Sequence, residues 1–207
     1  MRETPSPTLP LVHWDRLFED LEGQLASEWE AERAALDAES ERLRISKLEL
    51  SSRLRLLQHE GALLHLVLAD ERRRTVRLHA VGADWVGAQP TDAPTALLVP
   101  MRAILTIELD HGLLLSSLDE RVPVQPSLRE RMTLGFVLRD LARRRLPMRV
   151  ALRDGSTVHG TADRAGADHL DLAVHDVGEP RRAAAVRSFR MIPFDAVVWI
   201  SAEGAAF

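Results

Sequence analysis

Apolar residues occupy every second position in several stretches of the chain, for example across residues 64–68, 76–80 and 148–152. A period of two is typical of β-strands, because successive side chains of a strand point to opposite faces of a sheet. These stretches fall into two regions, residues 64–107 and 148–200. The alternation predicts several short strands in each region.

The two regions repeat one pattern. At an offset of 84, five residues of the first region fall on identical residues of the second: Leu68, Asp70, Gly82, Ala83 and Asp84 on Leu152, Asp154, Gly166, Ala167 and Asp168. Nine further residues then enter the second region, and an offset of 93 aligns Pro100, Ala103 and Ile107 with Pro193, Ala196 and Ile200. Because the insertion lies at one connection while the strands keep their register, the pattern indicates a duplicated small β-module.

The first hairpin differs between the two copies. In the second copy Asp154-Gly155 separates the first two strands, and this dipeptide is typical of a type I′ turn, in which both central residues have positive φ. The first copy has Asp70-Glu71 at the same place. Since glutamate disfavours positive φ, the sequence predicts a turn of another type there.

A long helix is predicted over residues 12–60, because the segment from Trp14 to Leu57 lacks proline and is rich in Glu, Ala, Leu and Arg. Apolar residues recur every seven positions along it, at Trp29, Leu36, Leu43, Leu50 and Leu57, and the first four are candidates for contact with a partner. That spacing supplies one half of a coiled-coil seam. Two interpretations stay open, namely a helix that dimerises or binds a partner, and a helix that packs on its own β-modules.

A second helix is predicted before the second copy. Ser127 and Glu130 form a capping box, and the apolar stripe that follows ends before Pro147. The stripe consists of Leu128, Met132, Phe136 or Val137, and Leu141. Each copy of the module is therefore expected to be a helix followed by about five strands.

Composition removes several classes of function. The chain of 207 residues has no cysteine, which excludes disulfides and thiolate sites. It has no run of the ~18–20 apolar residues that a membrane helix needs, and its first residues do not read as a signal peptide. We therefore expect a cytoplasmic protein that does not contact a membrane.

The charge is −4, and it is unevenly distributed. Residues 1–60 hold 13 acidic and 8 basic side chains, which leaves 18 acidic and 19 basic ones for the remainder. The β-modules are thus almost neutral, whereas proteins that neutralise many phosphates usually carry a clear positive excess. Overall charge argues mildly against nucleic-acid binding.

Arginine clusters nevertheless offer a candidate phosphate-binding surface. They lie in predicted turns, strands and the inserted loop, and the candidate residues for RNA or DNA are Arg72, Arg73, Arg74, Arg77, Arg149, Arg153, Arg181 and Arg182. The alternative is that these side chains only solvate turns. Trp85 lies in an outward register and is, with the four heptad residues, a candidate for contact with a protein partner. The alternative for Trp85 is packing under the long helix.

The densest group of potential metal ligands lies in the second copy and consists of His159, His169 and His175 with Asp163, Asp168 and Asp171. Their spacing does not match a tight metal-binding motif, and no nucleophile elbow or phosphate-cradling glycine loop occurs. We therefore predict that the chain is not an enzyme and uses neither a metal nor another cofactor.

The sequence VALRDGSTVHGTADRAGADHLDL, with Gly155 in the hairpin and Gly160 in the second strand, resembles the Sm-like barrel family, which includes the LSm proteins and the bacterial RNA chaperone Hfq. The resemblance implies closed five-stranded barrels that associate through their last two strands. The family's two RNA-binding elements are absent, because Leu172 follows Asp168 where Asn is expected and Ile192-Pro193 replaces Arg-Gly. The whole chain also resembles tandem-barrel proteins of high-GC actinobacteria, some of which are labelled Fis-family transcriptional regulators.

The predicted fold class is α+β: a long N-terminal helix and two small Sm-like five-stranded β-barrels, the second preceded by its own helix. The expected domains are a lead (1–11), the long helix (12–60), the first barrel (61–112), a linker and helix (113–146), the second barrel (147–202) and a tail (203–207). We expect a non-catalytic regulatory or assembly protein that associates with nucleic acid through its arginine-rich turns. The alternative is a scaffold or adaptor that acts through the N-terminal helix and the barrel edges.

Overall fold

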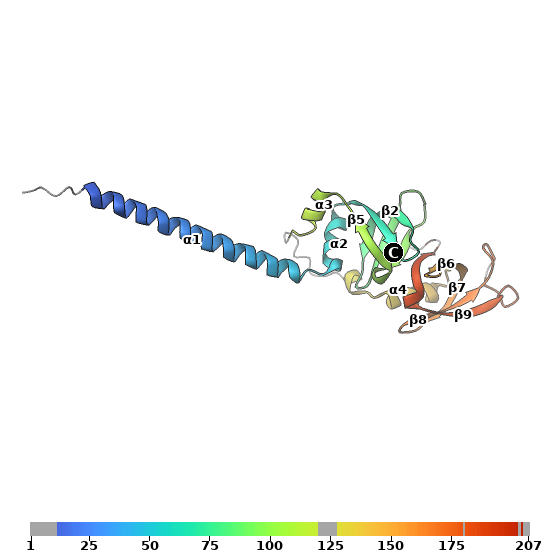
Figure 1. Ribbon diagram of the computed structural model, residues 1–207. Coiled ribbons are helices and arrows are strands. Elements are labelled where there is room, and N and C mark those ends of the chain that lie inside the picture. The colour runs from blue at the N-terminus through green and yellow to red at the C-terminus, as the bar shows by residue number, and fades with distance from the viewer. Residues whose placement is uncertain (1–11, 120–127, 180, 203, 205–207) are drawn as a thin grey trace, which may run out of the picture. The chain divides into compact units, whose positions relative to one another are not determined.

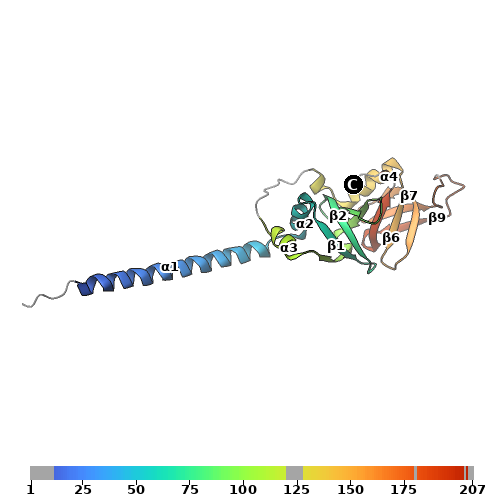
Figure 2. The same ribbon diagram turned by 90° about the horizontal axis from the view of Figure 1, so that it is seen from above.

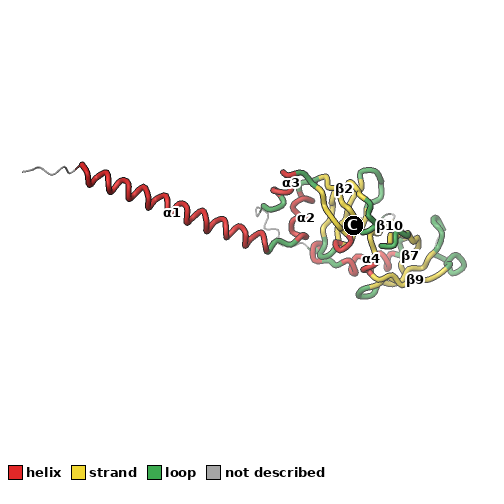
Figure 3. Tube along the Cα trace, viewed as in Figure 1, coloured by secondary structure: helices red, strands yellow, loops and turns green. Residues whose placement is uncertain are grey.

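The computed structural model describes residues 12–119, 128–179, 181–202 and 204. The chain divides into two units, residues 1–48 and 49–207. The first unit contains α1 (Val12–Ser46), and this element confirms the prediction of a long N-terminal helix (Figures 1 and 3). Among the described residues, no helix combines the length and the apolar character that crossing a membrane requires.

The segment predicted as one helix over residues 12–60 forms two. Residues 47–49 interrupt it, and α2 (Leu50–His59) belongs to the second unit. Leu54 and Leu57 of α2 are buried in the core of the sheet, and α2 lies along β2 (Arg73–Val81), as Figure 2 also shows. The packing of α2 against the sheet fixes where α2 lies, and helix propensity along the chain does not reveal this packing.

The second unit is built on one ten-stranded sheet in which every neighbouring pair is antiparallel. Besides β2, its strands are β1 (Leu63–Leu68), β3 (Trp85–Pro90), β4 (Leu97–Pro100), β5 (Ile104–Glu108), β6 (Pro147–Leu152), β7 (Thr157–Ala165), β8 (His169–Val174), β9 (Ser188–Pro193) and β10 (Val197–Ala202). The strand order is β5-β1-β2-β3-β4-β10-β6-β7-β8-β9. The sheet is therefore open, with β5 and β9 at its two edges.

The prediction of two small closed Sm-like barrels is wrong. Closing the first five strands on themselves would require β4 to pair with β5, but β4 pairs with β10 instead, with Leu98 opposite Ile200. The strand that would close one barrel thus joins the two copies into a single sheet. The pairing partner of an edge strand depends on residues far away in the sequence. The alternation of apolar residues along the strand itself does not reveal that partner.

Two halves of the second unit follow the same plan. The first half comprises α2 and β1–β5, and the second half comprises α4 (Leu134–Arg144) and β6–β10. Strands β1, β2 and β3 map on β6, β7 and β8 at an offset of 84, and the 3-10 turn Met101–Ala103 maps on Phe194–Ala196 at an offset of 93. Equivalent positions in the two halves can therefore be compared residue by residue.

The second helix begins later than its capping signal suggests. Ser127 lies outside the described residues, Leu128 is exposed, and α4 starts at Leu134 after the N-cap Thr133. The connection between the halves also contains α3 (His111–Ser116) and a short 3-10 turn, Arg129–Arg131. Helix α4 lies along β7 as α2 lies along β2 (Figure 2).

Apolar side chains of each half are buried in the hydrophobic core of the other half. Trp85 and Leu98 of the first half are buried in the core of the second half. Ala151 and Val198 of the second half are buried in the core of the first half. The two halves are consequently one packing unit, held by burial on both sides of the β4–β10 pairing.

The two hairpin turns are alike, because only one residue in each has a positive φ. The prediction of a type I′ turn at Asp154-Gly155 is wrong, since such a turn needs positive φ at both central residues and Asp154 does not have it. Glu71 has φ +59° at the place where Gly155 has φ +81°. The amide of Glu71 donates to the Leu68 carbonyl at 2.8 Å, and that of Gly155 donates to the Leu152 carbonyl at 3.0 Å. Glu71 thus occupies the left-handed region, which strains any residue that carries a Cβ.

Relieving this strain should stabilise the fold. We expect Glu71→Gly to raise the free energy of unfolding by about 0.5–1 kcal/mol, because the left-handed strain is removed while the unfolded chain gains some entropy. The matched change Gly155→Ala should lower it by about 1 kcal/mol. Urea denaturation measures both, and a loss of stability in Glu71→Gly, or no loss in Gly155→Ala, would show that positive φ is not the cause.

Candidate functional site

The contact between the two halves combines strand pairing, buried apolar side chains and hydrogen bonds, and we call it the internal junction. It comprises the β4–β10 pairing and the docking of the turn before β3 on the start of α4. In that turn Asp84 Oδ1 accepts a hydrogen bond from the Leu134 amide at 2.6 Å, which caps the helix. The Trp85 Nε1–H donates to the Met132 carbonyl at 2.8 Å. The junction therefore satisfies polar groups as well as burying apolar ones.

At the two free edges, the strand residues equivalent to those of the internal junction are exposed. Leu98 on β4 is 0% exposed, whereas its equivalent Met191 on β9 is 79% exposed. Val198 on β10 is 0% exposed, whereas its equivalent Leu105 on β5 is 55% exposed. Large apolar side chains on an open strand edge mark a surface that binds another strand.

The same asymmetry holds for the helix contact. Leu134, at the start of α4, is 1% exposed, while its equivalent Leu50 at the start of α2 is 46% exposed. Asp168 corresponds to Asp84, but among the described residues its carboxylate caps no helix and bonds only to His169, with Oδ1 and Nδ1 2.8 Å apart. That hydrogen bond lowers the pKa of Asp168 and raises the pKa of His169. We call Met191, Leu105, Leu50 and Asp168 the unpaired junction residues.

The eight candidate arginines do not form one free basic surface. Arg73 pairs with Glu108 at 2.6 Å and Arg181 pairs with Asp163. Arg153 donates to the Asp195 and Arg102 carbonyls, which uses its guanidinium inside the structure. Within the described ranges, four candidates make no hydrogen bond or ion pair through their side chains: Arg72, Arg77, Arg149 and Arg182. Association with RNA or DNA stays a prediction.

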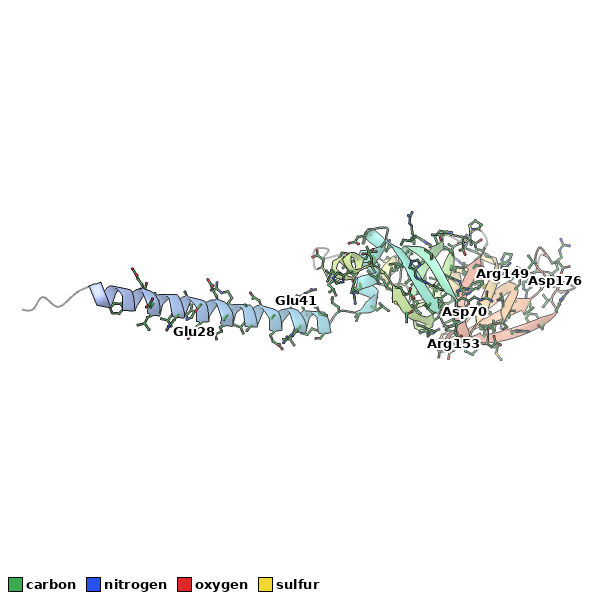
Figure 4. The ribbon with its side chains drawn as sticks, turned by 45° about the horizontal axis from the view of Figure 1, so that its top comes forward. Glu28, Glu41, Asp70, Arg149, Arg153 and Asp176 are labelled. Atoms are coloured by element: carbon green, nitrogen blue, oxygen red, sulfur yellow. The ribbon has the colours of Figure 1, made fainter. Side chains whose placement is uncertain are left out.

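Two of the eight candidates, Arg74 and Arg149, line one pocket, which we call the seam pocket. It has a volume of about 410 Å³ and spans the boundary between the halves. Its polar and aromatic lining includes Arg74, Asp92, Arg149, His159, Trp199 and Ser201. Arg149 and Asp70 lie in this sheet-bearing unit, as Figure 4 labels them. A concave pocket of this size that holds a few polar groups is typical of a small-molecule site.

Arg74 and Trp199 line the seam pocket, and Asp70 holds Arg74 in place. Arg74 donates to both carboxylate oxygens of Asp70, at 2.9 and 3.2 Å, and its guanidinium carbon lies 5.6 Å from the centre of the Trp199 ring. Burial of Asp70 acts to raise the pKa of its carboxyl group, but hydrogen bonds from Arg74 and the Arg72 amide hold that pKa below its ordinary value. The Arg74 side chain is therefore held in one orientation, and the Asp70 carboxylate neutralises its charge.

The Asp70–Arg74 pair predicts a pH dependence. Because the pKa of Asp70 is lowered by folding, its stabilising effect is present above the pKa of the unfolded chain and is lost as the pH falls through the folded pKa. We expect Asp70→Asn to lower the free energy of unfolding by about 1–2 kcal/mol at pH 7. The difference from the unchanged protein should shrink below about pH 3. Urea denaturation at both pH values measures it, and an equal difference at both would contradict the role of the charge.

The candidate partner-binding residues fall into two groups. Trp29, Leu36 and Leu43 are exposed on α1, which also carries Glu28 and Glu41 (Figure 4), and Leu50 is exposed on α2. Trp85 is buried and bonded to Met132, so its indole packs inside the junction rather than under the long helix or at the surface.

The three histidines of the second half contact neighbouring residues and do not gather around a common point. His175 is buried, its Nδ1–H donates to the Asp176 carbonyl at 3.0 Å, and its Nε2 lies 2.9 Å from Thr161 Oγ1. In the part of the chain that the structure describes, no three metal-ligating side chains come together.

No family model, curated protein or solved structure matches the chain. The resemblance to the Sm-like family therefore stays a prediction. Sequence reasoning missed Met191 and Leu105 as functional candidates. The offset of 93, which aligns them with Leu98 and Val198, was the signal that could have found them.

Proposed function

We propose that the chain is a non-catalytic assembly protein whose sheet is extended by further copies of itself. In this assembly β9 of one copy pairs with β5 of the next, as β4 pairs with β10 inside the chain. One observation carries the proposal. Strand and helix residues that are buried at the internal junction have large apolar equivalents that are exposed at the free edges.

The repeat also gives the expected register between copies. Leu98 lies opposite Ile200 inside the chain, and their equivalents are Met191 and Ile107. Met191 of one copy should therefore lie opposite Ile107 of the next. The pairing is antiparallel, and it would cover Leu105 as Val198 is covered at the internal junction.

A helix cap should accompany the strand pairing. The N-cap residue of α2, Glu49, makes no side-chain capping bond. Within the described residues no carboxylate bonds to the Leu50 amide as Asp84 bonds to the Leu134 amide of α4. Asp168 of a neighbouring copy is the equivalent acceptor, and it is exposed. Each contact between copies would thus bury an apolar strand edge and satisfy one helix terminus.

Sedimentation velocity over a range of protein concentrations tests this function. We expect the mean sedimentation coefficient of the full chain to rise with concentration. The variant Leu36→Glu, which changes an exposed heptad residue of α1, should keep that rise, because the proposed contact lies in the second unit. A monomer at every concentration, or loss of assembly in Leu36→Glu alone, would contradict assembly through the sheet edges.

A further inference from the structure

We propose that the seam pocket binds the phosphate group of a small phosphate monoester, with Arg149 as the principal anion-binding residue. This inference does not depend on assembly, because all the residues involved belong to one chain and lie at its internal boundary between the halves.

Three polar side chains form a row across neighbouring strands at the floor of the pocket. Ser201 on β10 lies opposite Arg149 on β6, and Arg149 lies opposite His159 on β7. Residues that are directly opposite in an antiparallel sheet place their side chains on the same face, with Cβ atoms about 4.5–5.5 Å apart. A hydroxyl, a guanidinium and an imidazole thus face one small volume, which matches the donors that a tetrahedral oxyanion accepts.

The His159 ring is fixed by contacts with His175, which leave its Nε2 atom available to bind a ligand. Its Nδ1 lies 3.1 Å from the His175 carbonyl, and a carbonyl can only accept, so Nδ1 carries the proton. The His159 ring also packs edge-on against the His175 ring, with centroids 5.1 Å apart. Nε2 is left without a hydrogen-bond partner among the described residues, and His159 lines the pocket. Fixed orientation of this kind lowers the entropic cost of binding.

The opposite wall is also preorganised. Gln89 Nε2 donates to the Ala93 carbonyl at 2.7 Å, and the Thr91 amide donates to the Thr75 carbonyl at 3.0 Å. These bonds fix the connection between β3 and β4, which carries Pro94 into the pocket lining beside Pro90 of β3. The pocket therefore has rigid walls before any ligand arrives.

The charged side chains that line the seam pocket favour a ligand with one phosphate group. Arg74 is compensated by Asp70, whereas Arg149 makes no ion pair in the described part of the chain. One free guanidinium suits a single bidentate oxyanion better than a long polyanion. Asp92, which also lines the pocket, would repel further phosphates and can accept a hydrogen bond from a hydroxyl group. A hydroxylated monophosphate fits this arrangement, and a nucleic-acid backbone fits it less well.

Isothermal titration calorimetry of the full chain at low salt tests the site with four probes: inorganic phosphate, ribose 5-phosphate, ribose, and a single-stranded oligonucleotide. We expect ribose 5-phosphate to bind once per chain, inorganic phosphate to compete with it, and ribose to give no signal. Arg149→Ala should weaken binding at least tenfold, while the control Arg77→Ala, another exposed arginine without a charged partner, should leave it unchanged. Arg149 is exposed, so thermal melting of the variant should match that of the unchanged protein.

Three results would overturn the proposal. The first is the absence of binding by both phosphate probes, and the second is equal binding by Arg149→Ala and the unchanged protein. The third is binding of the oligonucleotide alone, which would assign the pocket to nucleic acid. Partial weakening by His159→Gln together with full loss in Arg149→Ala would support the division of roles described above.

Discussion

Replacing Met191 by glutamate is expected to weaken self-association at least 100-fold while leaving the fold of the chain intact. Met191 is exposed on the edge strand β9, so the monomer tolerates a charge there. In the assembly the same position becomes equivalent to Leu98, which is fully buried. A carboxylate buried without a partner costs several kcal/mol, and each 1.4 kcal/mol is a factor of ten in affinity. Sedimentation velocity measures the effect.

Two further variants sharpen this test. Leu105→Glu blocks the other edge and should be equally impaired alone. A mixture of Met191→Glu and Leu105→Glu contains one intact β5 and one intact β9, so it should form a mixed dimer through a single contact. The control Phe136→Glu places the same charge at an exposed apolar residue of α4 and should assemble normally. Independent failure of both edge variants without rescue in the mixture would argue against pairing of β9 with β5.

Gly82→Ala is expected to lower the free energy of unfolding by about 3 kcal/mol or more. A Cβ at this position would lie 2.2 Å from Nε1 and 2.4 Å from Cε2 of Trp85. The indole cannot move aside, because it is buried in the core and donates to the Met132 carbonyl. Overpacking of a closed core and loss of a buried hydrogen bond both contribute to the cost. Thermal or urea denaturation measures it.

The equivalent change in the second half provides the control. A Cβ on Gly166 would lie 2.4 Å from Cε1 of His169, but that ring is partly exposed and can rotate away. Gly166→Ala should therefore cost no more than about 1 kcal/mol in the monomer, because only a surface contact is lost. Equal destabilisation by the two changes would mean that Trp85 is not held as the structure places it.

The sequence predicted the local features of this fold. Alternation of apolar residues indicated the strands, and the offsets of 84 and 93 aligned Gly82 with Gly166 and Ile107 with Ile200. The long N-terminal helix followed from composition and the absence of proline. These features depend on neighbours in the chain, which is why a sequence pattern can reveal them.

Strand partners could not be predicted in the same way. The apolar sequence of β4 is compatible with closing a barrel and with pairing to β10, and only the packing of Trp85, Leu98 and Val198 between the halves decides between them. The resemblance to a family of closed barrels favoured the first alternative, and the structure has the second. The type I′ turn at Asp154-Gly155 was mispredicted for a related reason, since the hairpin imposes one positive φ on each copy, at Gly155 and at Glu71, although glutamate alone disfavours it.

The candidate site was partly accessible from the sequence. Arg74 and Arg149 were singled out, and both line the seam pocket. Their different roles depend on ion pairs that the sequence does not show, because Asp70 compensates one of them and no carboxylate among the described residues compensates the other. Runs of arginine therefore indicated where positive charge lies, but not which charge is free to bind.

Disulfide cross-linking between two single-cysteine variants tests the central claim most directly, because the chain contains no cysteine of its own. Met191→Cys and Ile107→Cys are purified separately, mixed and oxidised. If β9 of one copy pairs with β5 of the next in the register of the internal junction, the two Cα atoms should lie about 4.5–5.5 Å apart, within the range that a disulfide spans. We predict a cross-linked heterodimer in the mixture and little product from either variant alone. A mixture that cross-links no better than the separate variants would contradict assembly through the sheet edges.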